Sequence, residues 1–193
     1  MFILYAVVIG LVVGFLVGGR PAGLGDIQLR WSWVILGGLL VQVVLFSEAM
    51  SERIGALGPP IYIGSTALVI AAILANRAIP GMRLVALGAV SNLTAIVANG
   101  GYMPASAGAA AALGKHDPTG YSNSALIPDP VLGPLTDIFA LPAWLPFANV
   151  FSIGDVLIGI GIVLVIVKAM RAGAPAAPTA TTTTTTTERP LGA

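Results

Sequence analysis

The chain has 193 residues, of which 56% are hydrophobic and only 9% are charged, against about 25% charged residues in soluble domains. Its net charge of +1 excludes the strongly basic surface that nucleic-acid binding requires, so we expect no nucleic acid as a partner. With no cysteine and one histidine, it has too few ligands for the usual zinc, iron–sulfur or haem sites, and we expect no metal and no cofactor. This composition is typical of a protein embedded in a lipid bilayer.

Five apolar runs, separated by charged or Pro/Gly-rich segments, predict the fold. In hydrocarbon every backbone polar group must be paired within the segment, which favours helices over irregular structure. Several runs are near the short end of the about 17–25 residues that span a bilayer. We therefore predict an all-α polytopic membrane protein with five transmembrane helices, at about residues 2–19, 32–47, 60–75, 84–98 and 151–168.

Basic residues predict the orientation, because Lys and Arg near helix ends mark the cytoplasmic side. One side of the predicted membrane carries six of them and the other carries two. The N-terminus is therefore expected outside, the C-terminus in the cytoplasm, and the loop 99–150 outside. The six are Arg20, Arg30, Arg77, Arg83, Lys168 and Arg171, and the two are Arg53 and Lys115.

Two segments outside the spans have distinct compositions. The end of the long loop, residues 135–150, is aromatic, apolar and interrupted by prolines. It predicts a short interfacial or re-entrant helix with Trp144 at the level of the lipid headgroups. Residues 171–193 are rich in Ala, Pro and Thr and predict a disordered cytoplasmic tail.

Glycines repeat every fourth residue in the first run, at Gly10, Gly14 and Gly18. This spacing lets two helices approach closely, either within one chain or between two copies. Packing within the chain is the favoured interpretation, and the oligomeric state stays unpredicted.

Two aspartates flank the Pro-interrupted segment, and each has two interpretations. Ser152 and Asp155 have the spacing of a helix N-terminal capping box, and Asp137 with Thr136 fits a turn or a helix start. Alternatively, the two carboxyls meet at the outer surface and share one proton, because two negative charges so close together are costly. One carboxyl would then activate water while the other protonates the leaving group.

The stretch TDIFALPAWLPFANVFSIGDVLIGIGIVLVI resembles the C-terminal part of the bacterial lipoprotein signal peptidases. In that family two catalytic aspartates lie in a Val-Asp-Phe-Ile stretch and a Phe-Asn-x-Ala-Asp stretch, and Asp137 and Asp155 match them. The resemblance covers about residues 135–167 and implies an aspartyl peptidase acting at the membrane surface on a membrane-anchored peptide. Ser152 replaces the asparagine of the second motif, although Asn149 lies nearby.

Residues 1 to about 170 also resemble an uncharacterised family of bacterial integral membrane proteins, a domain of unknown function. The motifs NGGYMP (99–104) and FSIGD (151–155) carry this resemblance. It implies a location in the bacterial plasma membrane and implies no activity or cofactor.

Asn99 has a structural interpretation, in which the glycines after it end a helix, and a functional one, in which its amide faces the aspartates. Two functions follow. One is an aspartyl hydrolase with Asp137 and Asp155 as the catalytic pair and Asn99, Asn149 and Ser152 orienting the substrate. The other is a non-catalytic membrane module that binds a lipid or a partner protein through the outer loop.

Overall fold

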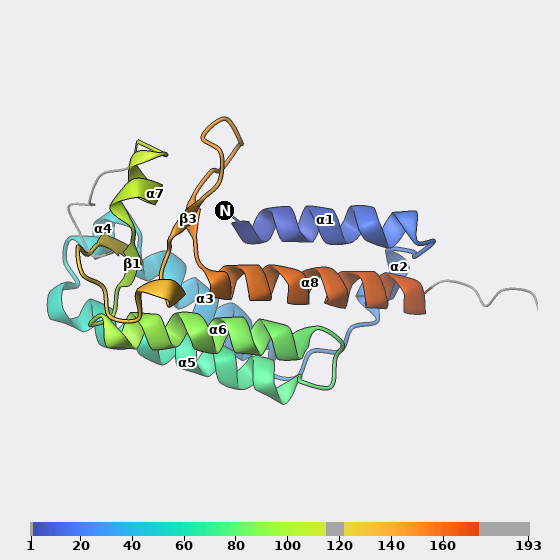
Figure 1. The fold of residues 1–193 in the computed structure, drawn as a ribbon. Coiled ribbons are helices and arrows are strands. Elements are labelled where there is room, and N and C mark those ends of the chain that lie inside the picture. Colours follow the sequence, from blue (N-terminus) through green and yellow to red (C-terminus); the bar gives the residue numbers. More distant parts are fainter. Residues whose placement is uncertain (1, 115–121, 174–193) are drawn as a thin grey trace, which may run out of the picture.

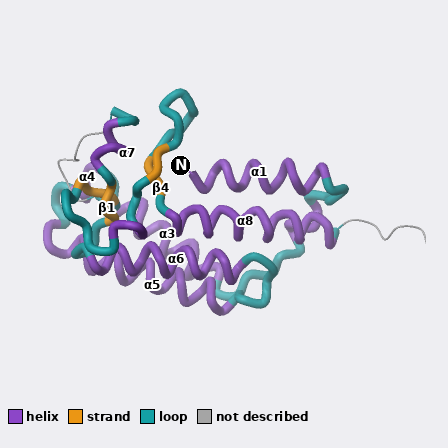
Figure 2. The backbone as a smooth tube through the Cα atoms, viewed as in Figure 1, coloured by secondary structure: helices purple, strands orange, loops and turns teal. Residues whose placement is uncertain are grey.

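The computed structural model describes residues 2–114 and 122–173, and this part of the chain is mostly helical (Figures 1 and 2). The predicted tail lies outside the described residues from 174 onward, and its first two residues belong to a helix. The long helices are α1 (Phe2–Leu16), α3 (Ser32–Leu45), α5 (Gly58–Ala75), α6 (Met82–Ala98) and α8 (Ile153–Ala172). The short helical turns are α2 (Ala22–Gly25), α4 (Glu48–Ser51), η1 (Gly55–Leu57), α7 (Ala107–Ala111) and η2 (Gly133–Leu135).

The five long helices coincide with the five predicted apolar segments. Two of them, Gly55–Ala75 with its leading 3-10 turn and Ile153–Ala172, are long and apolar enough to cross a membrane. The other three are apolar but shorter, between 10 and 17 residues. The helical fold is therefore confirmed, whereas a crossing of the bilayer by all five helices stays a prediction.

Close glycine contacts hold α6 against α8, which lies at the centre of the helices (Figure 1). A Cβ on Gly88 would collide with the Gly154 carbonyl oxygen, and a Cβ on Gly161 would meet Val85 and the Gly81 carbonyl. Gly81 and Gly88 are seven residues apart, and so are Gly154 and Gly161. The two contacts therefore lie about two helical turns apart. The backbones can approach this closely only where both helices carry hydrogen in place of a side chain.

The glycine pattern in α1 serves packing within the chain, as favoured from the sequence. Gly10 and Gly14 are buried against α8, where an added Cβ would meet Ile166 or Met170. Gly18 instead lies beyond the helix at a positive φ of 77°, with open space around its Cβ position. Only the first two glycines of the pattern therefore form the helix contact.

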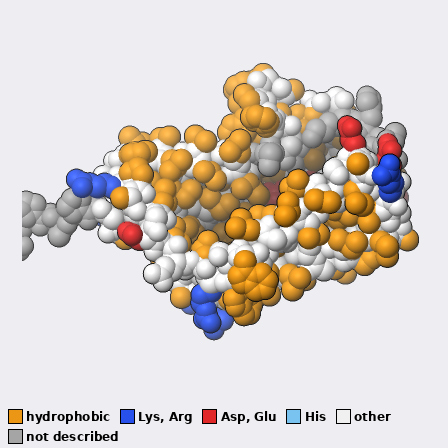
Figure 3. All heavy atoms as spheres, turned by 180° about the vertical axis from the view of Figure 1, so that it is seen from behind, with side chains coloured by type: hydrophobic (Ala, Val, Ile, Leu, Met, Phe, Trp, Pro, Cys, Tyr) orange, Lys and Arg blue, Asp and Glu red, His pale blue; other side chains and the backbone are white. Residues whose placement is uncertain are grey.

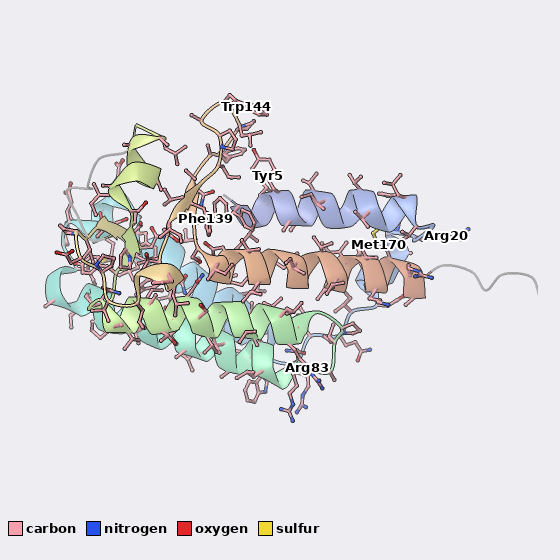
Figure 4. The ribbon with its side chains drawn as sticks, in the orientation of Figure 1. Tyr5, Arg20, Arg83, Phe139, Trp144 and Met170 are labelled. Atoms are coloured by element: carbon pink, nitrogen blue, oxygen red, sulfur yellow. The ribbon has the colours of Figure 1, made fainter. Side chains whose placement is uncertain are left out.

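Basic residues gather at one end of the helices, which we call the basic end and define by Arg20, Arg30, Arg77 and Arg83. Figure 4 shows Arg20 and Arg83 at this end. The Arg20 amide donates to the Met170 carbonyl at 2.8 Å, and the Asn76 side chain pairs with both backbone groups of Arg30 at 2.8 Å. The structure thus brings together charges that the sequence assigned to one side of a membrane.

The opposite end is covered by a cap, defined as the described residues of 99–152. Its strands are β1 (Met103–Ala105), β2 (Ser124–Leu126), β3 (Phe139–Ala140) and β4 (Val150–Phe151). β1 pairs with β2 in parallel, β3 pairs with β4 antiparallel, and a bridge joins Ala105 to Asp137. The cap therefore brings Asp137 next to β1, near the start of the loop, and places Phe151 just before α8.

The predicted interfacial or re-entrant helix in residues 135–150 is wrong. The segment is an arm formed by the β3–β4 hairpin, and helical structure stops at the 3-10 turn Gly133–Leu135. Pro142 and Pro146 lack the N–H that a helix interior needs, and Phe147 adopts a left-handed turn at φ 56°. The Tyr5 hydroxyl donates to the Pro146 carbonyl at 2.5 Å, which ties the arm to α1 (Figure 4).

Candidate functional site

A cavity of about 350 Å³ lies between the cap and the ends of the long helices. Thr66 lines it eight residues after the first residue of α5, so the cavity reaches about 12 Å along that helix. Figure 3, seen from behind, shows a hollow on the flank of the helices with acidic atoms inside it and hydrophobic side chains around it. The lining residues are Phe2, Ile3, Gln42, Tyr62, Thr66, Ala89, Asn92, Ile96, Met103, Asn123, Asp137, Asn149, Val150, Asp155 and Ile158.

Asp155 reaches this cavity from the first turn of α8. The Ser152 hydroxyl accepts from the Asp155 amide at 3.0 Å, and Asp155 Oδ2 accepts from the Ser152 amide at 3.1 Å. This is the reciprocal capping box that the sequence predicts, and it also places a carboxylate at the positive end of the helix. The capping box therefore fixes the rotamer of Asp155.

Asn92 on α6 fixes the same carboxylate from a second helix. Its Nδ2 donates to Asp155 Oδ1 at 2.9 Å, and its Oδ1 accepts from the Ser152 hydroxyl at 2.8 Å. A Cβ on Gly154 would collide with Asn92 Oδ1, so the absence of a side chain there allows the contact. Each oxygen of Asp155 thus accepts one bond, which leaves capacity for further donors.

Asp137 reaches the cavity from the cap. It is 7% exposed, and its backbone amide donates to the Pro104 carbonyl at 2.9 Å while its carbonyl accepts from the Ser106 amide at 3.0 Å. These bonds attach the residue to β1 and to the start of α7. The two predicted aspartates therefore line one cavity, one from a helix and one from the cap.

Asn149, just before β4, is the third predicted residue that lines the cavity. Its Nδ2 donates to the Val150 carbonyl at 2.6 Å. Its Oδ1 is buried and has no hydrogen-bond partner in the described part of the chain. Leaving a buried acceptor unpaired costs about 1–3 kcal/mol.

The structure does not bring Asn99 and Ser152 to the cavity. Asn99 ends α6, where its Nδ2 donates to the Ala95 and Val131 carbonyls and its Oδ1 accepts from the Val131 amide, all at 2.8–2.9 Å. Ser152 is fully buried, and its hydroxyl bonds with Asn92 and with the Asp155 amide in the capping cluster described above. Both residues hold the backbone or the neighbouring side chains in place, which supports their structural interpretation.

Sequence reasoning missed Asn92, Gln42 and Thr66 as members of the site. Gln42 Nε2 donates to the Thr66 hydroxyl at 3.2 Å, joining α3 to α5 below the cap. Polar side chains inside apolar helices are expensive unless they face the protein interior. A polar side chain within an apolar run, such as Asn92 in SNLTAIVA, was the signal that could have identified these residues.

The polar lining of the cavity combines two carboxyls with neutral amides and hydroxyls. Asp137 and Asp155 supply the carboxyls, and none of the described lining residues is Lys or Arg. The amides come from Gln42, Asn92, Asn123 and Asn149. Across the described ranges, no group of three or more His, Cys, Asp or Glu side chains is close enough to hold a metal ion. The arrangement suits a polar group that both donates and accepts hydrogen bonds.

Comparison with known proteins identifies a family but assigns no activity. The sequence pattern of a group described as "Family of unknown function (DUF5317)" matches residues 26–167. No curated protein and no solved structure matches the chain. The expected resemblance to an uncharacterised family is confirmed, whereas the bacterial membrane location and the similarity to signal peptidases stay predictions.

Proposed function

We propose that this chain, which belongs to the DUF5317 family, is a polytopic membrane module that binds the polar head of a bilayer component in the cavity beneath its cap. All five long helices cross the bilayer, with the basic end in the cytoplasm and the cap outside. The positive-inside rule supports this orientation, because the basic residues sit at one end of the helices.

The observation that carries this function is a cavity lined by fixed polar groups inside an otherwise apolar helix bundle. Asp155 is held by Ser152 and Asn92 before any ligand arrives. Preorganised groups of this kind favour binding, because the ligand need not pay to order them. Cavities with apolar walls and a few oriented polar groups are typical of small-molecule sites.

Lipid retention tests this function. The full chain is purified from native membranes in mild detergent and its bound lipid is measured by native mass spectrometry. Ala89→Phe introduces a ring into the cavity and is expected to abolish the bound lipid, while Ala71→Phe, on an exposed position of α5, keeps it. Equal lipid on both variants, or none on the unmodified chain, would overturn the proposal.

A second function, aspartyl hydrolysis, is favoured by the presence of both Asp137 and Asp155 in one cavity. One carboxylate takes a proton from water, whose oxygen bonds to a carbonyl carbon. The other, protonated, carboxyl gives its proton to the leaving nitrogen or oxygen as that bond breaks. The products are a carboxylic acid and an amine or alcohol, and the two carboxyls have exchanged protonation states.

Isotope incorporation separates hydrolysis from binding. The chain in vesicles is incubated with bacterial membrane extract in ¹⁸O-labelled water, and a hydrolytic product carries one labelled oxygen. Asp137→Asn, Asp155→Asn and the double variant should then lose product to the same extent, because residues that act as a unit are not additive. Absence of any labelled product leaves the binding function as the account of the site.

A further inference from the structure

The basic end, together with the last turns of α8, carries two groups of cationic side chains. The first lies where α1 ends beside α8, and its members are Arg20, Lys168 and Arg171. The second, which we call the α3 group, lies where α3 begins, α5 ends and α6 begins, and its members are Arg30, Arg77 and Arg83. Figure 4 shows Arg20 and Arg83 apart at this end. All six side chains are exposed, and Asp26 is the one carboxylate among the described residues nearby, so both groups keep a positive excess.

Asn76 fixes the backbone of Arg30 beside Arg77. The Asn76 side chain is 4% exposed, its Oδ1 accepts from the Arg30 amide, and its Nδ2 donates to the Arg30 carbonyl, both at 2.8 Å. These bonds join segments 46 residues apart and use only the backbone of Arg30, so its guanidinium and that of Arg77 remain exposed. Guanidinium groups match the geometry of phosphate oxygens, so two of them on adjoining segments suit one phosphate group.

Two exposed tryptophans lie next to this pair. Trp31 follows Arg30 directly and is 49% exposed, and Trp33 is 74% exposed. Tryptophan beside basic residues at a helix end is typical of the level of the lipid headgroups in membrane proteins. The α3 group therefore has the composition of a surface that meets a bilayer.

An apolar stripe runs along α3 from this group. Its four members are separated by three or four residues, which places them on one face of the helix. They are Trp33, Leu36, Leu40 and Val43, and each is 62–74% exposed. Gly38 and Gln42, which meet Val69 and Thr66 of α5, lie on the opposite face of α3. The stripe therefore faces away from α5, the long helix against which α3 packs.

The length of the stripe matches one leaflet of a bilayer. Ten residues separate Trp33 from Val43, so the stripe is about 15 Å long. The hydrocarbon core of a bilayer is about 30 Å thick, and each leaflet supplies about half of it. An acyl chain whose headgroup lies at the α3 group can therefore contact the stripe over its whole length.

We propose that the α3 group is a binding site for an anionic phospholipid, whose phosphate lies between Arg30 and Arg77 and whose acyl chain lies along the α3 stripe. The positive excess favours a headgroup with net negative charge over a zwitterionic one, whose own cation the arginines repel. This site is separate from the cavity beneath the cap. It depends on α3 lying in the bilayer, which is part of the proposed function, and not on any ligand of the cavity.

Quenching of Trp31 and Trp33 tests the ligand class. The Trp144→Phe chain, which keeps only these two tryptophans, is placed in phosphatidylcholine bilayers with a fixed fraction of a lipid brominated on its acyl chains near the headgroup. Brominated phosphatidylglycerol should associate about fivefold more tightly than brominated phosphatidylcholine, the factor that one arginine contributes at an anionic surface. Equal quenching by the two brominated lipids would overturn the proposal.

Two double substitutions that remove the same charge locate the site. Arg30→Gln/Arg77→Gln should lower the preference for phosphatidylglycerol to below about twofold, and the segment should stay in place because Asn76 binds only the backbone of Arg30. Arg20→Gln/Arg171→Gln removes two charges from the first group and should keep the preference. Equal losses in the two variants would show that the whole end attracts lipid, and would contradict a site at the α3 group.

Two further outcomes separate this site from a free phosphate site and from the cavity. Excess glycerol 3-phosphate should leave the preference unchanged, because it has no chain for the α3 stripe, and loss of the preference would contradict the proposal. If Ala89→Phe abolishes the lipid of the cavity but the chain shows no preference for phosphatidylglycerol, the proposed function stands and this inference fails. If the preference is present and no lipid occupies the cavity, the α3 site stands and the cavity function fails.

Discussion

The contact between Asn92 and Asp155 should be measurable as a coupling energy between α6 and α8. The Nδ2 to Oδ1 distance is 2.9 Å, and the acceptor is a partly buried carboxyl. Hydrogen bonds to charged groups contribute about 1.5–3 kcal/mol in soluble proteins, but bonds between membrane helices average about 0.6 kcal/mol and reach about 1.7. We expect a coupling of about 1–1.5 kcal/mol, because geometry and charge favour the upper part of the membrane range.

A double-mutant cycle isolates this value. Asn92→Ala also loses the Ser152 bond and Asp155→Ala also loses the helix cap, and such separate losses cancel in the cycle. Free energies of unfolding are measured by SDS titration in mixed micelles. Thr94, whose hydroxyl donates to the Val90 carbonyl within α6, provides the control cycle with Asp155 and should show additivity within about 0.5 kcal/mol. A coupling between Asn92 and Asp155 below about 0.5 kcal/mol would refute the role of this bond in positioning the carboxyl.

The remaining predictions concern packing, depth and the attachment of the cap. Gly88→Ala should destabilise the chain by about 1–3 kcal/mol in the same unfolding assay, while Gly64→Ala, with open space at its Cβ position, should be neutral or stabilise by up to about 1 kcal/mol. With the other two tryptophans replaced by Phe, Trp144, which is 80% exposed, should be quenched more by lipids brominated near the headgroup than by those brominated near the chain end, and the reverse order would contradict an interfacial arm. Asn99→Ala should cost about 1–3 kcal/mol and increase proteolysis near Val131, and unchanged cleavage would show that its bonds do not secure the cap.

The helices could be predicted because their signal is local. An apolar run bounded by polar residues specifies a buried or lipid-facing helix, and the expected segment 84–98 corresponds to Met82–Ala98. The arm could not be predicted in the same way. Its aromatic, Pro-interrupted sequence suits either an interfacial helix or a hairpin, and the choice depends on the pairing of Phe139 with Phe151, twelve residues apart. The parallel pairing of β1 with β2 likewise depends on contacts between distant residues.

The site was partly predictable for the same physical reason. The capping box of Ser152 and Asp155 is a local pattern with fixed spacing, so the sequence identified it correctly. The position of Asn92 against Asp155 depends on the close packing at Gly154, which a single segment does not reveal. The functional interpretation of Asn99 was not supported. An amide at a helix end is compatible with a ligand contact as well as with a structural role, and only the structure shows its bonds to Val131.

Cross-linking tests most directly the central claim, that Asp137 and Asp155 face one cavity. The chain has no cysteine, so the Asp137→Cys/Asp155→Cys variant carries two unique thiols. A sphere of the cavity's volume is about 9 Å across, and a bifunctional methanethiosulfonate with a spacer no longer than that should join the two thiols. It should leave the Asp129→Cys/Asp155→Cys variant unlinked. Linking of the second pair and not of the first would contradict the account.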